Sequence, residues 1–371
     1  MRVLRIDEHS PFRQLIGVGG LGTGIFFALE GDHTLGRNES RLGKLLDVRD
    51  YCKLHIVSHY VAKLLGASRA RFTVTPLGKV GDDSAGKFVL SEMRDVGMDT
   101  RSVKVVHGQP TLFSVCFQYP DGTGGNLTTA NSAAATLSEE DIDDAWCLVD
   151  SVGPKTIALL VPEAPLASRN HFLRLARQAG AFCASSFAFG EIAEAKRLGM
   201  FYDLNLVALN EEEAAEFAGE PYIGSSPESF VERLRCLLSS SYPQLKVVMS
   251  VGKDGAYFVD SSGRSHSSAP KVVEVASTAG AGDCLLGGVL AALAAGIALP
   301  SPQGQANENL QLENVLDFGV LLASYKVSSP HTIHPDASLD NLLRFAQQLR
   351  IAVAPQIEQL LSDTEVMKSS D

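Results

Sequence analysis

Three features are missing from this chain of 371 residues, and each absence excludes a class of protein. The six cysteines form no C-x-x-C pair, which argues against structural zinc and favours reduced thiols in the cytoplasm. No run of Lys and Arg stands out and the net charge is -11, so we expect no nucleic-acid partner. The longest apolar stretch, Val289 to Leu299, is broken by Gly296 and is too short to span a bilayer, so we expect no membrane partner.

The chain does contain strands that alternate with helices, a pattern typical of an α/β domain with a mostly parallel sheet. Its 45% hydrophobic and 20% charged residues suit one large domain over residues 1–371 with a small accessory piece. Two segments break the alternation, about 30–53 and 104–129, and their turn-rich composition predicts a small β lid.

The segment from Ser277 to Gly288 is a glycine-rich turn that ends in one acid, Asp283, where a helix begins. A short Val-rich stretch before it, 271–276, predicts a strand, and the helix should stop at Gly296. Unpaired backbone amides at a helix start attract anions, and glycines let an anion come close. The turn therefore predicts an anion hole with a general base, although a first-turn acid that only complements the helix dipole fits the turn equally well.

Four segments in order carry a resemblance to a known family. They are Pro76–Phe88 followed by a helix and Gly97-Met98-Asp99-Thr100, Asp203–Ala214 with Asn210-Glu211-Glu212-Glu213, Val247–Tyr257, and Ser277–Gly288. Together they resemble the two signatures, the Asn-x-x-Glu element and the nucleotide-side hairpin of the PfkB family of carbohydrate kinases. The resemblance implies a ribokinase-like three-layer α/β/α sandwich with a mostly parallel central sheet and a small β lid.

The resemblance also implies roles for individual residues. Asp283 would be the catalytic base, with Gly280, Ala281 and Gly282 as the anion hole. Asn210 and Glu213 would organise Mg²⁺, with Glu213 acting through water, and Ser250, Gly252 and Gly255 would lie beside ATP. The cofactors implied are ATP and Mg²⁺.

One glycine cluster favours a different class of protein. Gly17-Val18-Gly19-Gly20-Leu21-Gly22 fits the G-x-G-x-x-G pattern of a dinucleotide-binding dehydrogenase. The following segment 23–29 contains Gly24 and runs into a polar stretch, whereas a Rossmann unit needs a helix there. We therefore interpret the cluster as the first strand of the sheet leading into the lid.

Departures from the family concentrate where the acceptor should bind. Gly22-Thr23-Gly24 stands where family members carry an Asp that holds sugar hydroxyls, and Cys52–His59 replaces the Gly-Gly-x-x-x-Asn element. Ser277 replaces the Asp that commonly opens the glycine turn. New contacts could come from the polar residues of the neighbouring segment, namely Asp32, His33, Arg37, Asn38, Glu39, Arg41, Asp50, Lys53 and His55.

We select Gly22, Gly24, Arg37, Arg41, Lys53 and His55 as the candidate acceptor residues. Two arginines four residues apart, Arg37 and Arg41, suit an acceptor that carries a carboxylate or phosphate, although a solvated surface pair is the simpler interpretation. The acceptor should then be something other than plain ribose or fructose, with an anionic or heterocyclic group.

The predicted function is transfer of the γ-phosphate of ATP to a hydroxyl of a sugar or sugar-like acceptor. Two alternatives remain open. One is a nucleoside kinase of the pseudouridine kinase type, and the other is a ribokinase-like protein that binds ligands without catalysis. The resemblance also makes a homodimer through the lid possible.

Overall fold

The main sheet is formed by strands spread over most of the chain. The structure, a computed structural model, describes residues 2–69, 71–120, 124–222, 227–271, 273–301 and 310–362. The strands of the main sheet are β2 (Gln14–Val18), β5 (Thr73–Gly81), β6 (Val103–Val106), β9 (Thr156–Leu160), β10 (Phe182–Ser186), β11 (Leu206–Leu209), β12 (Lys246–Ser250), β13 (Ala256–Val259) and β14 (Arg264–Ser267). They form a nine-stranded sheet in the order β14-β13-β12-β11-β10-β9-β2-β5-β6. Neighbours from β12 to β6 run parallel, and β13 and β14 are antiparallel.

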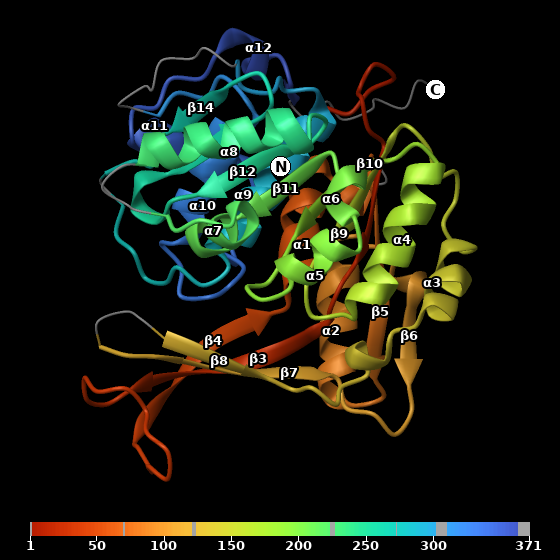
Figure 1. Cartoon of the computed structure of the whole chain (residues 1–371), viewed down its shortest axis with the longest axis vertical. Helices are drawn as coiled ribbons and strands as arrows, with labels where there is room; N and C mark the ends of the chain where they lie inside the picture. Colours follow the sequence, from red (N-terminus) through yellow and green to blue (C-terminus); the bar gives the residue numbers. More distant parts are fainter. Residues whose placement is uncertain are drawn as a thin grey trace, which may run out of the picture.

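Helices cover both faces of this sheet (Figure 1). The first face packs against α1 (Lys53–Leu65), α2 (Ser84–Asp95), α9 (Ala281–Ala295), α10 (Val315–Lys326) and α11 (Leu339–Gln348). The second face packs against α3 (Glu139–Trp146), α4 (Leu166–Gln178), α5 (Ile192–Arg197), α6 (Met200–Asp203), α7 (Glu211–Ala218) and α8 (Pro227–Ser241). Successive side chains of β9 alternate between the two cores, with Ile157 and Leu159 in the first and Ala158 and Leu160 in the second. The three-layer sandwich predicted from the sequence is therefore confirmed.

A second, four-stranded sheet forms the lid and lies below the main sheet in Figure 1. Its strands are β3 (Gly22–Leu29), β4 (Gly43–Tyr51), β7 (Leu112–Gln118) and β8 (Gly124–Thr128), in the order β4-β3-β7-β8. The first lid segment thus starts at Gly22, earlier than the predicted 30–53, because β3 leaves the main sheet directly after β2. A two-stranded ribbon pairs β1 (Val3–Leu4) with β15 (Leu361–Ser362), and α12 (Pro355–Glu358) precedes β15.

The predicted strand at 271–276 is wrong. Residues 271 and 273–276 belong to no strand and lead as irregular chain into the glycine turn, while residue 272 lies outside the described part. The Val-rich composition of this stretch gave a strand signal, but the chain here finds no sheet edge to pair with. The helix that follows ends as predicted, at Gly296 with φ 91°, where a left-handed backbone favours glycine.

Within the described ranges, no helix is both long enough and apolar enough to cross a membrane.

Candidate active site

A cavity of about 660 Å³ lies where the carboxyl ends of β11 and β12 meet the start of α9. Its lining includes Ser250, Gly252 and Gly255, which the sequence predicted beside the nucleotide, and Asn210, which it predicted to organise Mg²⁺. One wall is apolar and comes from residues of α9, α10 and the chain around them, Val273, Val275, Leu285, Val320, Ala323 and Val327. Open α/β sheets bind ligands at the carboxyl ends of their strands, and an apolar wall with a few polar groups suits a heterocyclic base.

The glycine turn forms the first turn of α9 at the edge of this cavity. Gly280 is the N-cap residue with φ 74°, and a Cβ atom there would lie 2.8 Å from the carbonyl oxygen of Thr332. Glycine is required at this position for both reasons. Ala281 and Gly282 line the cavity.

The amides of this turn differ in their availability. The Ala281 amide donates to the carbonyl of Thr278 at 3.0 Å, so it is already used inside the turn. In the described part of the chain, the amides of Gly280, Gly282 and Asp283 donate to no protein acceptor. An anion hole at this turn would therefore use these three amides, and the predicted part of Ala281 would be limited to shaping the turn.

Asp283 stands in the first turn of α9, and its carboxylate faces a lysine from the start of α1. The Nζ atom of Lys53 lies 3.6 Å from Oδ1 of Asp283, and the two side chains are 33% and 11% exposed. The charge of Asp283 raises the pKa of Lys53 above its usual value, so this lysine is a stable ammonium at neutral pH. The structure thus brings together two residues that are far apart in the sequence, Lys53 and Asp283.

Asn210 and Glu213 form a capping box at the start of α7. The Oδ1 atom of Asn210 accepts the Glu213 amide at 2.8 Å, and Oε2 of Glu213 accepts the Asn210 amide at 2.8 Å. Burial raises the pKa of Glu213, with Lys53 and Asp283 close enough to influence it. The described residues contain no group of three or more His, Cys, Asp or Glu side chains that could hold a metal ion. Protein contacts to Mg²⁺ at this place would therefore be few.

The two predicted glycines of the acceptor side sit where strands of the lid approach each other closely. A Cβ atom at Gly22 would lie 2.1 Å from the carbonyl oxygen of Leu112, and one at Gly24 would lie 2.3 Å from Oδ2 of Asp50. Gly22 is therefore explained by strand packing. Gly24 leaves room for the side chain of Asp50, which lies opposite it on β4.

Two predicted acceptor residues have other partners. Arg41 donates to Oε1 of Glu39 at 2.7 Å and to the carbonyl of His33 at 2.6 Å, within the turn between β3 and β4. This pairing counts against a contact between Arg41 and an acceptor, and neighbouring Arg37 is exposed in the same turn. His55 is fully buried in α1 with its ring 4.4 Å from that of Tyr51, so we withdraw it as an acceptor ligand.

Sequence reasoning missed two residues that the fold brings next to Lys53 and to the neighbouring end of β4. Glu163 follows β9 in a left-handed backbone with φ 72°, and its Oε2 atom accepts the Lys53 amide at 3.1 Å. Thr332 accepts the Tyr51 amide at 3.1 Å, and its carbonyl lies against Gly280. Burial raises the pKa of Glu163, with Lys53 opposing this shift. A strained φ at an acid beside a strand end often marks a functional site, but sequence carries no signal of it.

A second buried lysine lies behind the glycine turn. Lys326 is fully buried in α10, and its Nζ atom donates to the carbonyl of Ser277 at 3.1 Å. Burial lowers its pKa to about 8. None of the ion pairs formed by described residues involves Lys326, so its charge supports the turn through this carbonyl.

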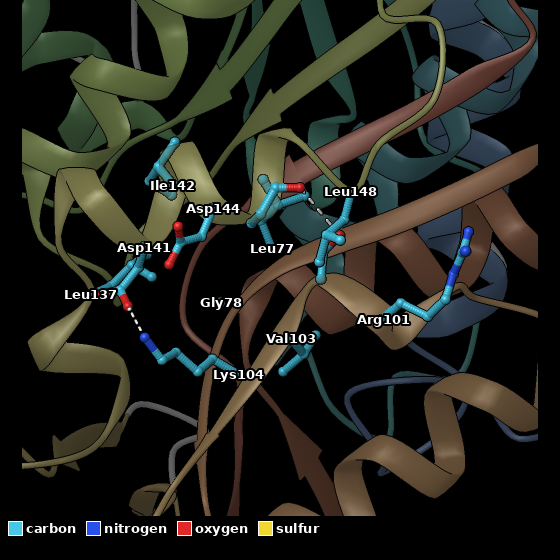
Figure 2. Close-up of a pocket in the computed structure, with 12 residues that line it drawn as sticks. Leu77, Gly78, Arg101, Val103, Lys104, Leu137, Asp141, Ile142, Asp144 and Leu148 are labelled. Carbon is cyan, nitrogen blue, oxygen red and sulfur yellow. Dashed lines mark hydrogen bonds and ion pairs between the residues drawn. The ribbon is translucent and has the colours of Figure 1, made fainter.

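A second, smaller cavity of about 180 Å³ lies between β5, β6 and α3. Figure 2 shows its lining, where Lys104 from β6 reaches Asp141 of α3 at 2.8 Å. Lys79 also pairs with Asp141, so the charge of Asp141 is compensated within the protein. None of the predicted site residues lines this cavity.

Comparison with protein families matches residues 58–338 to the description "pfkB family carbohydrate kinase". The chain therefore belongs to the pfkB family of carbohydrate kinases. A comparison with curated protein sequences found no match.

Solved structures of low sequence identity share the fold. Ribokinase from Cryptococcus neoformans var. grubii serotype A in complex with ADP is 20% identical with a TM-score of 0.72, covering 90% of this chain and 99% of its own. Ribokinase from Giardia lamblia is 17% identical with a TM-score of 0.71, covering 91% and 99%. Burkholderia thailandensis nucleoside kinase in complex with inosine is 15% identical with a TM-score of 0.66, covering 91% and 99%. The fold is ribokinase-like.

Proposed function

We propose that this protein transfers the γ-phosphoryl group of ATP to a hydroxyl of a sugar or nucleoside, with Mg²⁺ present. The observation that carries the proposal is the position of Asp283. It occupies the first turn of α9, whose Ala281 and Gly282 line the 660 Å³ cavity, while Lys53 approaches its carboxylate from α1. A base between a nucleotide cavity and an acceptor side is the arrangement that phosphoryl transfer to an alcohol needs.

The residues divide the reaction between them. Asp283 takes the proton of the acceptor hydroxyl, whose oxygen forms a bond to the γ-phosphorus. The bond between that phosphorus and its bridging oxygen breaks, and ADP leaves with the electron pair. Free amides at Gly282 and Asp283 donate to the transferring oxygens, a kind of stabilisation that works best when donors are held in place beforehand. Lys53 places its ammonium group 3.6 Å from Oδ1 of Asp283, where it can orient this carboxylate.

The residues present fit a magnesium ion that is held mainly by phosphate. Glu213 uses Oε2 in the capping box, which leaves Oε1 free to accept a water of the metal. Asn210 lines the nucleotide cavity. Mg²⁺ keeps several waters and needs only one or two carboxylates, and when bound it neutralises phosphate charge.

The acceptor class, the homodimer and the cellular location are further parts of the proposal, and each rests on a separate observation. The Burkholderia relative with inosine makes a nucleoside acceptor a specific alternative to a sugar. For the homodimer through the lid, the support is a set of exposed leucines on the lid, Leu42, Leu45 and Leu127, which are 76%, 58% and 69% exposed. A cytoplasmic location remains a proposal based on the free cysteines.

The test is an acceptor screen that measures ADP release and the phosphorylated product together. The purified protein is incubated with ATP and Mg²⁺ and with each of a panel of pentoses, hexoses, sugar acids and nucleosides. Transfer to at least one acceptor supports the proposal. Binding of ATP and of a panel compound without any phosphorylated product would favour the non-catalytic alternative instead.

A further inference from the structure

The lid carries a buried carboxylate that the proposed reaction does not use. Asp50 lies near the end of β4 and is only 7% exposed. None of the ion pairs between described residues includes it. Its carboxylate accepts from Cys116 of β7, whose Sγ lies 3.6 Å from Oδ2 and is a weak donor, and it also interacts with the Tyr51 amide and the Thr332 hydroxyl. The buried ammonium of Lys326 is close enough for Asp50 to influence its pKa, but the two groups form no ion pair. A buried carboxylate that has no ion pair costs stability, and a ligand that donates hydrogen bonds to it would offset this cost.

The surroundings of Asp50 connect it to the site of phosphoryl transfer. Thr332 bonds to both strand neighbours of Asp50: its Oγ1 accepts the Tyr51 amide at 3.1 Å and its amide donates to the Arg49 carbonyl at 3.1 Å. The carbonyl of the same threonine lies against Gly280 of the anion-hole turn. Burial raises the pKa of Asp50 to about 6, and the negative charge of Asp283 adds to this shift, which indicates that the two carboxyl groups are close.

Glycine at position 24 makes room for this carboxylate. The two residues pair across β3 and β4, and no side chain fits at Gly24, because its Cβ would lie 2.7 Å from the carbonyl oxygen of Ser114 as well as 2.3 Å from Oδ2 of Asp50. The sequence at Gly24 had indicated a lost contact to acceptor hydroxyls. The fold supplies a carboxylate at the same point from the neighbouring strand.

We propose that Asp50 binds the acceptor by accepting hydrogen bonds from its hydroxyl groups, and that the acceptor is a neutral polyol, as a free sugar or the ribose of a nucleoside. This inference rests on the proposed kinase function. Three carboxylates, Asp50, Glu163 and Asp283, gather on the acceptor side, where Lys53 is the cation that contacts Asp283. These three carboxylates outnumber the two lysines near them, Lys53 and Lys326, so the surroundings disfavour an anionic group on the acceptor. This replaces the expectation of an anionic acceptor drawn from Arg37 and Arg41.

The experiment measures binding by calorimetry, without turnover, so that it is independent of catalysis. The probes are matched sets: ribose, 2-deoxyribose and ribose 5-phosphate, and inosine with 2'-deoxyinosine and 3'-deoxyinosine. We expect the wild-type protein to bind the full hydroxyl compound of at least one set roughly 5- to 100-fold more tightly than a deoxy compound. It should also bind ribose more tightly than ribose 5-phosphate.

The variant Asp50→Asn should lose this preference to within about twofold and keep its ADP affinity, because the amide removes the charge but not the shape. The matched control Asp47→Asn changes an exposed carboxylate of the same strand and should behave like the wild type. If Asp50→Asn does not fold, Asp50→Ser takes its place in the same binding measurements. The comparison of hydroxyl and deoxy compounds on the wild-type protein does not depend on any variant.

Three results would overturn the inference: an unchanged hydroxyl preference in Asp50→Asn, tighter binding of ribose 5-phosphate, or no binding of any probe to the wild-type protein. Binding with the expected preference but without phosphoryl transfer in the acceptor screen would contradict the kinase function alone.

Discussion

The two sides of the site obtain their residues in different ways. On the phosphate side, Gly280, Gly282 and Asp283 belong to one turn, and backbone amides supply most of the donors. On the acceptor side, Asp50, Lys53 and Glu163 come from β4, α1 and the end of β9, and side chains supply the chemistry. The family match begins at residue 58, so it includes the turn of α9 and Glu163 but leaves out β3 and β4.

This difference has a physical basis. Kinases that act on different acceptors can use the same triphosphate donor, and amides at a helix start suit it whatever the neighbouring side chains are. An acceptor is distinguished by its hydroxyls and charge, which specific side chains must match. In the role proposed for Asp50, the carboxylate that contacts the acceptor comes from position 50 of β4 and not from position 24 of β3.

The largest effect should come from the phosphate side, with the substitution Asp283→Asn. Loss of the general base should lower kcat by about 10²- to 10⁴-fold, because the acceptor hydroxyl then keeps its proton. ADP binding, measured by thermal shift, should remain. The control is Asp95→Asn, which changes an exposed carboxylate at the end of α2. Retention of more than about a tenth of the wild-type kcat would remove Asp283 from the role of base.

A second prediction separates magnesium from acceptor binding. Both Glu213→Gln and Glu213→Ala should raise the Mg²⁺ concentration needed for half-maximal rate by roughly tenfold or more, with little change in acceptor KM. Glutamine keeps an oxygen for the capping box with Asn210, so only the alanine variant should lose about 1 kcal/mol of stability. Magnesium titrations that overlay the wild-type curve would exclude Glu213 from the metal environment.

A third prediction concerns the effect of the buried Asp50 carboxylate on the free energy of unfolding. The pKa of Asp50 is about 6 in the folded protein, against about 3.9 in the unfolded chain. Because the folded state holds this proton more tightly, the contribution of Asp50 to stability is present below pH 4 and is lost as pH rises through 6. Asn cannot ionise, so Asp50→Asn should stabilise the protein at pH 7.5 by on the order of 2–3 kcal/mol and have little effect near pH 4.

Melting temperatures of both proteins at pH 4.5 and 7.5 provide the measurement, with Asp47→Asn as the control. The gain of Asp50→Asn should be a few °C larger at the higher pH. An equal difference at both pH values would mean that Asp50 titrates normally and is not buried as a carboxylate.

The smallest effect should come from the turn between β3 and β4. Arg41 is already paired with Glu39 and the His33 carbonyl, so Arg41→Ala should change acceptor KM by less than about twofold. Arg37→Ala should behave alike, because Arg37 is exposed in the same turn. A tenfold rise in acceptor KM for either variant, with ATP KM unchanged, would restore the hypothesis that this turn binds an anionic acceptor.

Local patterns in the sequence were sufficient for the elements that depend on neighbours in the chain. The helix stop predicted at Gly296 is where α9 ends, and the capping box of Ser138 and Asp141 at α3 shows a helix start formed by residues three positions apart. The alternation of strands and helices predicted the layered fold. The stretch 271–276 shows the limit of such patterns, because β-branched residues form a strand only where a partner strand is available.

The sequence by itself determined the layered α/β fold, the family and the turn that carries Asp283, because each of these depends on residues within a few positions of one another. Only the tertiary structure decided which carboxylates and lysines meet. Lys53 reaches Asp283 across more than half of the chain, and Asp50 reaches the space above Gly24 through the pairing of β3 with β4. Those contacts depend on strand register and helix packing, and neither can be predicted from local patterns in the sequence.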